Sequence, residues 1–229
     1  MKVDRYYLEI LTLDNLNQVN SPNKDLIIEK VNPPNIELNK FDDIKIHEGA
    51  VSEVSGRKEF WLAAESNLNS FHKDHLDQSG TIQEAIEVDV FSVASLIEKY
   101  GSINYIRMDI EGHEFEVLRA ISKLEDSQTL FPDVIFETHN RTYSPDRDIS
   151  QLLKTLFEKG YSVPYASSSS PDGTRKLEQL GSPGRFSIRT DDTRRTIHED
   201  LPIEILEKCL NPSGGIRTIF LRGRRAEYA

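Results

Sequence analysis

The chain has 229 residues and one cysteine, so we expect a single α/β domain with a full core and no internal disulfide. Its 38 acidic and 28 basic residues give a formal net charge of −10, which argues against a nucleic-acid or anionic-membrane partner because phosphate binding needs clustered Lys and Arg. No apolar run is long enough to cross a bilayer, and no signal peptide is visible. We therefore expect a cytoplasmic protein.

The N-terminal residues are ambiguous. The spacing of apolar residues between positions 5 and 20 favours a short helix, whereas residues 7–13 alone also fit a strand. We predict the helix and keep the strand as the alternative. Residues 25–31 form one short apolar element between prolines.

Strands that alternate with helices follow, a pattern typical of βαβ units and a mainly parallel sheet. The predicted strands cover residues 44–47, 57–62, 86–90, 104–110, 133–138, 161–163 and 216–221, and the predicted helices cover 91–100, 113–124, 149–159 and 201–210. Residues 65–80 are predicted to form a loop, and the serine-rich run 167–173 a mobile surface loop, with a substrate lid as the alternative. Residues 174–200 are polar and predict no element.

The stretch 105–121 carries the strongest functional signal. Its first six residues alternate between apolar and polar, and the apolar spacing changes to three and four residues after Gly112, which predicts a strand that turns into an amphipathic helix. Asp109 and Glu111 then lie at the C-terminal end of a strand, the edge where open α/β sheets bind ligands. Together with Glu114 they form a carboxylate cluster, and one explanation is that Arg107 simply pairs with these acids at a solvated edge.

Residues 108–120, MDIEGHEFEVLRA, resemble the signature of the FkbM-type methyltransferases. Blocks at 35–39, 44–52 and 132–137 are similar to further family blocks in the same order. The resemblance covers about residues 20–165 of one domain spanning 1–229, with 166–229 as a C-terminal extension. It implies a class I methyltransferase-like (Rossmann-like) fold with a mostly parallel sheet, and the use of S-adenosylmethionine (SAM) for O-methylation of a small-molecule or glycan acceptor.

The resemblance also implies the residues of the site. Asp109 and Glu111 would orient the acceptor hydroxyl or accept its proton, with His113 and Glu137 in support. On the cofactor side it implies Ala50, Val51, Ser52 and Ser70. No metal is assigned. The rival chemical interpretation is a metal site, because Asp109, Glu111, His113, Glu137 and His139 together offer carboxylate and imidazole ligands.

The sequence departs from the family at its N-terminal end. Residues 1–48 contain no glycine, so the glycine-rich loop after the family's first strand is not found, and the ribose-binding acid is missing from its usual place. The simplest expectation is that the chain starts just after that loop, with the first strand absent or replaced, SAM bound weakly and stability reduced. Exposed strand edges would then favour a homodimer. The alternative function is a non-catalytic domain that lost the cofactor and acts as a binding or assembly module.

Overall fold

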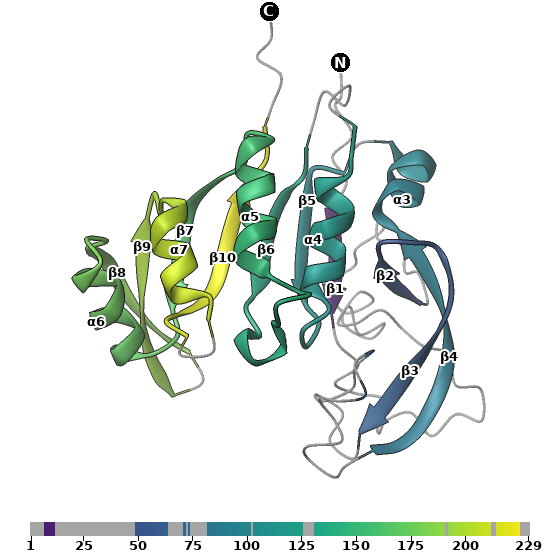
Figure 1. Ribbon diagram of the computed structural model, residues 1–229, viewed down its shortest axis with the longest axis horizontal. Coiled ribbons are helices and arrows are strands. Elements are labelled where there is room, and N and C mark those ends of the chain that lie inside the picture. Colours follow the sequence, from purple (N-terminus) through teal and green to yellow (C-terminus); the bar gives the residue numbers. More distant parts are fainter. Residues whose placement is uncertain are drawn as a thin grey trace, which may run out of the picture.

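The computed structural model describes residues 7–11, 49–63, 71, 73, 82–101, 103–125, 131–190, 192–211 and 214–224. These residues form a mixed α/β fold with five α-helices and two mixed sheets. The larger sheet has a layer of helices on the near face in Figure 1, and the smaller sheet lies beside it. No helix in this part of the chain is long and apolar enough to span a membrane.

The larger sheet combines a parallel and an antiparallel part. Its strands, in spatial order, are β1 (Tyr7–Leu11), β5 (Tyr105–Asp109), β6 (Asp133–Glu137), β10 (Ile216–Arg222), β7 (Ser162–Ser168), β9 (Thr193–Glu199) and β8 (Gly184–Thr190). Strands β1, β5 and β6 are parallel, and every other pairing in this sheet is antiparallel. The prediction of a mostly parallel sheet is therefore wrong. The physical reason is that β10 inserts between β6 and β7, and β8 and β9 add a hairpin, a connection that only antiparallel strands allow.

The smaller sheet contains β2 (Ala50–Ser52), β4 (Ile82–Ser92) and β3 (Gly56–Ala63) in that order. Strand β2 pairs parallel to β4, and β3 pairs antiparallel to it. Phe60, Val88 and Val90 form a small core that Phe71 covers. This sheet carries Ser52 toward the helix layer, because β2 contacts the helix that follows β5.

The described helices are α3 (Val93–Tyr100), α4 (Glu114–Ser122), α5 (Ile149–Glu158), α6 (Pro171–Gln179), α7 (Ile203–Cys209) and the 3₁₀ helix η3 (Asn140–Thr142). In Figure 1, α4, α5 and α7 lie side by side against the larger sheet. Ile106 and Met108 of β5 are buried beneath them with Val117 and Leu118 of α4, whereas Arg107 is exposed. The alternation predicted for residues 105–110 is thus confirmed, and it fixes the opposite orientation of Asp109.

Three further sequence predictions are wrong. Residues 7–11 form β1, parallel to β5, so the strand alternative holds in place of the helix, and the position beside β5 is filled. The serine run is the end of β7 and the start of α6: Ser168 is fully buried and its Oγ accepts a hydrogen bond from the Thr196 N–H at 2.8 Å, while Ser170 caps α6. Residues 174–200, which predicted no element, supply most of α6 and the β8–β9 hairpin. The elements expected at 25–31 and 44–47 lie outside the described residues.

Candidate active site at the ends of β5 and β6

A sharp turn after β5 brings three carboxylates together. Asp109 ends the strand, Glu111 follows in the left-handed region at φ 50°, and Gly112 continues the turn at φ 97°. The left-handed conformation costs a non-glycine residue about 1–3 kcal/mol. A Cβ on Gly112 would lie 2.5 Å from Cγ2 of Thr142, so only glycine fits between the turn and η3. The turn leads directly into Glu114, the first residue of α4.

Glu114 is anchored by the backbone that precedes it. Its side chain is fully buried, and Oε1 accepts a hydrogen bond from the N–H of Ile110 at 2.9 Å. The same oxygen lies 3.0 Å from Nδ1 of His139. Burial by itself would raise the pKa of Glu114, but the nearby imidazole and the backbone donors lower it below the usual value. Glu114 is therefore an ionised group in the protein interior.

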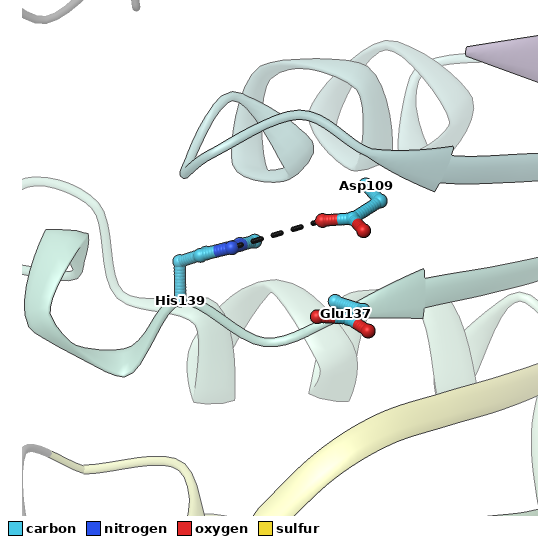
Figure 2. A group of neighbouring side chains, drawn as sticks. All are labelled: Asp109, Glu137 and His139. Carbon is cyan, nitrogen blue, oxygen red and sulfur yellow. Dashed lines mark ion pairs between the residues drawn. The ribbon is translucent and has the colours of Figure 1, made fainter. Parts of the chain in front are cut away.

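His139 lies close to carboxylates at the ends of both strands. It follows β6 by two residues, and its Nε2 lies 3.3 Å from Oε2 of Glu111 and 3.8 Å from Oδ1 of Asp109. Figure 2 shows the ring lying between the ends of the two strands, directed at Asp109. Burial alone would lower the pKa of His139, but the carboxylates of Glu114 and Glu111 raise it to about 11. The imidazole is thus a cation at neutral pH.

Glu137 closes the cluster from the side of β6. Its carboxylate forms an ion pair at 2.5 Å with Arg217 of β10, the strand that pairs with β6 in register Thr218 to Glu137. Burial raises the pKa of Glu137, and the neighbouring Asp109 raises it further against the effect of Arg217. Burial likewise raises the pKa of Asp109, while His139 opposes that shift. Burial therefore makes both Asp109 and Glu137 take up a proton more readily than an exposed carboxylate of the same kind does.

His113 belongs to a second group of side chains. It is 4% exposed, its Nε2 lies 3.0 Å from Oγ of Ser52, and its ring packs against Phe71 with centroids 4.6 Å apart. Its Nδ1 lies 3.4 Å from Oε2 of Glu116. Through these contacts the structure joins this histidine to Ser52 of the predicted cofactor side.

The remaining predicted cofactor residues have different surroundings. Val51 is buried in the main core, and Ala50 packs against the small core of Phe60 and its neighbours. Ser70 lies outside the described residues. Of this set, Ser52 alone has a described polar contact with a predicted catalytic residue, and its hydroxyl also accepts a hydrogen bond from Lys58 Nζ at 3.1 Å.

Arg147 holds the turn from outside. Its guanidinium donates to both carboxylate oxygens of Glu116, at 3.1 and 2.9 Å, and to the carbonyl oxygens of Thr142 and Gly112 at 2.9 and 2.5 Å. Bidentate pairs of this kind fix geometry as well as adding energy. The conformation of residues 111–113 is therefore set by the segment after η3.

The sequence predicts Asp109, Glu111 and Glu137 as site residues. The structure places all three around His139. His139 entered the sequence argument only as a metal ligand, although it stands two residues after Glu137 and so lies at the same strand end. Nothing in the sequence indicates that residues 216–221 pair with β6, so the sequence does not predict a role for Arg217. Glu114 was recognised as part of the acidic cluster, but not as its buried anchor.

Comparison with known proteins finds a family whose model matches most of the chain. The family model for the methyltransferase FkbM domain matches residues 11–163, which is well over half of the chain and includes every cluster residue except Arg217. No curated protein and no solved structure matches the chain. The match agrees with the resemblance seen around Gly112. The chain belongs to the FkbM methyltransferase family.

Proposed function

We propose that this protein is a SAM-dependent methyltransferase that methylates an oxygen of a small molecule or glycan. The observation that carries the proposal is the convergence of Asp109, Glu111 and Glu137 on His139 at the C-terminal ends of two adjacent parallel strands. This is the edge where ligands bind in α/β sheets. Family membership supplies the class of reaction, and the cluster supplies groups that suit a hydroxyl acceptor.

The residues present fit the chemistry of the cofactor. SAM, when bound, supplies an electrophilic methyl group on a cationic sulfonium, and its sulfur leaves as a neutral thioether. Asp109, Glu111, Glu114 and Glu137 outnumber His139 and Arg217, so the cluster carries an excess of negative charge that favours a cation nearby. Ser52, beside His113, is the polar side chain that we assign to the cofactor side.

In the proposed reaction the protein mainly aligns the acceptor. The carboxylate of Asp109 or of Glu111 would accept the one hydrogen bond that the acceptor hydroxyl can donate, and would so orient its oxygen for methyl transfer. Asp109 would take up the hydroxyl proton when the methyl group is transferred, because burial raises the pKa of its carboxyl group. His139 is a positioning residue, because its positive charge keeps the carboxylates together.

The test is transfer of radiolabelled methyl from SAM to a panel of hydroxylated acceptors. Asp109→Asn should lower the rate about 10²–10⁴-fold, the usual contribution of a positioned acid or base. Asp172→Asn is the matched control, because Asp172 is 82% exposed on α6 and lies outside the cluster. Equal rates for Asp109→Asn and the wild type would remove the assignment.

A second candidate function is a non-catalytic binding or assembly module. It is favoured by the absence of glycine from residues 1–48, since a glycine-rich loop lets the backbone approach the cofactor closely. The same assay separates the two, because a module of this kind gives no product with any acceptor.

We further propose a cytoplasmic protein without nucleic-acid or membrane partners. We also propose a homodimer formed through β1, the edge of the described larger sheet. Sedimentation velocity tests the dimer.

A further inference from the structure

Three possible metal ligands converge beyond the ends of β5 and β6. Asp109 ends β5, Glu137 ends β6, and His139 lies in the loop beyond it; one ligand atom from each lies within 4.8 Å of the others. Figure 2 shows the His139 ring directed at Asp109, with Glu137 at the end of the neighbouring strand. We propose that Asp109, Glu137 and His139 bind a divalent metal cation.

The spacing suits one ion. Oxygen and nitrogen ligands lie about 2.0–2.2 Å from a small divalent cation, so two ligands of one ion are at most about 4.4 Å apart. The Nε2 atom of His139 and Oδ1 of Asp109 are 3.8 Å apart, within that limit. A modest side-chain rotation brings the widest pair into range.

Glu114 provides an independent reason to assign a metal here. Histidines that ligate metals almost always present their other ring nitrogen to a carboxylate or carbonyl, which fixes the ring. The fully buried Glu114 lies 3.0 Å from Nδ1 of His139 and is itself held by the Ile110 N–H. On the other side of the ring, Nε2 lies 3.8 Å from Oδ1 of Asp109. The second oxygen of Glu114, Oε2, is also buried and has no hydrogen-bond partner among the described residues.

The charge of the cluster points the same way. Four carboxylates, those of Asp109, Glu111, Glu114 and Glu137, meet one imidazole and the guanidinium of Arg217. Even with His139 protonated, the acids are in excess, and half-buried like charges repel one another. The competing account is that the imidazolium alone holds the acids together. A bound dication compensates more charge, because it displaces the proton from Nε2 of His139 and takes that nitrogen as a ligand.

The mixture of donors indicates which ions fit. Carboxylate oxygens alone favour Mg²⁺ or Ca²⁺, whereas an imidazole nitrogen shifts the preference to first-row transition metals. We therefore expect Mn²⁺ or Zn²⁺ to bind more tightly than Mg²⁺. Three protein ligands leave coordination positions for water or an acceptor oxygen. That last consequence rests on the proposed function, whereas metal binding itself does not.

The experiment is a titration of untagged, chelator-stripped protein with Mn²⁺, followed by electron paramagnetic resonance without SAM or acceptor. We expect one site, weakened at least tenfold in Asp109→Asn and His139→Gln, and about 10–100-fold in Glu114→Gln because it orients the ring. Asp172→Asn should bind as the wild type does. Because SAM is absent, failure here leaves the methyltransferase proposal standing, and failure of methyl transfer leaves this one standing.

A second measurement needs no variant. In ¹⁵N-labelled wild type, substoichiometric Mn²⁺ should broaden amide signals of residues 109–111 and 137–139 before those of the β8–β9 hairpin. Because it uses only the wild type, this measurement still tests the proposal if a variant does not fold. The proposal is overturned if Mn²⁺ broadens the hairpin first, if wild type shows no saturable site, or if folded Asp109→Asn and His139→Gln bind Mn²⁺ as tightly as wild type.

Discussion

The charged state of His139 makes stability fall as the pH rises. In the unfolded chain a histidine releases its proton near pH 6.5, whereas in the folded protein the pKa of His139 is about 11. Between these values the folded state holds one proton more than the unfolded state. The stabilisation is therefore complete below pH 6.5 and declines until pH 11 is passed.

The magnitude follows from the linkage. One extra proton in the folded state changes the free energy of unfolding by about 1.36 kcal/mol per pH unit. From pH 7.5 to 9.5, His139 should thus remove about 2.7 kcal/mol. Burial also raises the pKa of the Cys209 thiol, which lowers stability in the upper part of this window. The contribution of His139 must therefore be taken as a difference between proteins.

Urea denaturation at several pH values, with a chelator present to keep metals away, supplies that difference. His139→Gln lacks the titrating ring and keeps Cys209, so its unfolding free energy should fall with pH by about 2.7 kcal/mol less than that of the wild type over the same window. His139→Gln combined with Glu114→Gln controls for the carboxylate that loses its cation. Parallel curves for wild type and His139→Gln would refute the assignment of a charged, ion-paired imidazole.

Two further predictions concern the turn that builds the site. Gly112→Ala should be destabilised by about 1–3 kcal/mol more than Gly181→Ala in urea, because both glycines have similar positive φ values but only the Cβ at 112 meets Thr142; equal losses would mean that backbone strain alone matters. Arg147→Met should cost about 3–5 kcal/mol, since it leaves the half-buried Glu116 without its bidentate partner, and adding Glu116→Gln should recover part of that loss. If the second substitution worsens stability, the pair is not what holds the turn.

The centre of the fold could be predicted from sequence because its local signals agree. The strand at 104–110 alternates strictly, Gly112 marks the turn, and the apolar period then becomes helical; β5 and α4 follow that pattern. The strand at 133–138 is a short apolar run, typical of a strand buried on both faces, and it is β6. In both cases the positions of the apolar residues in the sequence indicate which side chains are buried.

Elements that depend on partners far along the chain could not be predicted. The run around Ser168 has the composition of a loop, yet β10 and β9 pair with it from either side and bury it. Pairing of β10 between β6 and β7 makes the sheet mixed, and strand order is not encoded by local periodicity. For residues 7–11, helix and strand periodicities overlap, and the parallel pairing with β5 decides the outcome.

Only part of the candidate site could be predicted from the sequence, because some of its contacts join residues that are far apart along the chain. Asp109 and Glu137 were found because each follows directly from a strand end. His113, by contrast, lies at the start of α4 and its ring meets Ser52 of the smaller sheet, a contact that spans 61 positions of sequence. Arg217 reaches Glu137 only through the pairing of β10 with β6.

The most direct test of a methyltransferase site at these strand ends is a titration of ¹⁵N-labelled protein with SAM, followed by NMR. We expect saturable shifts in fast exchange, because residues 1–48 supply no glycine for a cofactor loop. The shifts should include Ser52 and residues 109–114, and they should leave the β8–β9 hairpin unchanged. Shifts confined to the hairpin, or no response up to the solubility of SAM, would contradict the site, and slow exchange from tight binding would contradict the argument from the missing glycines.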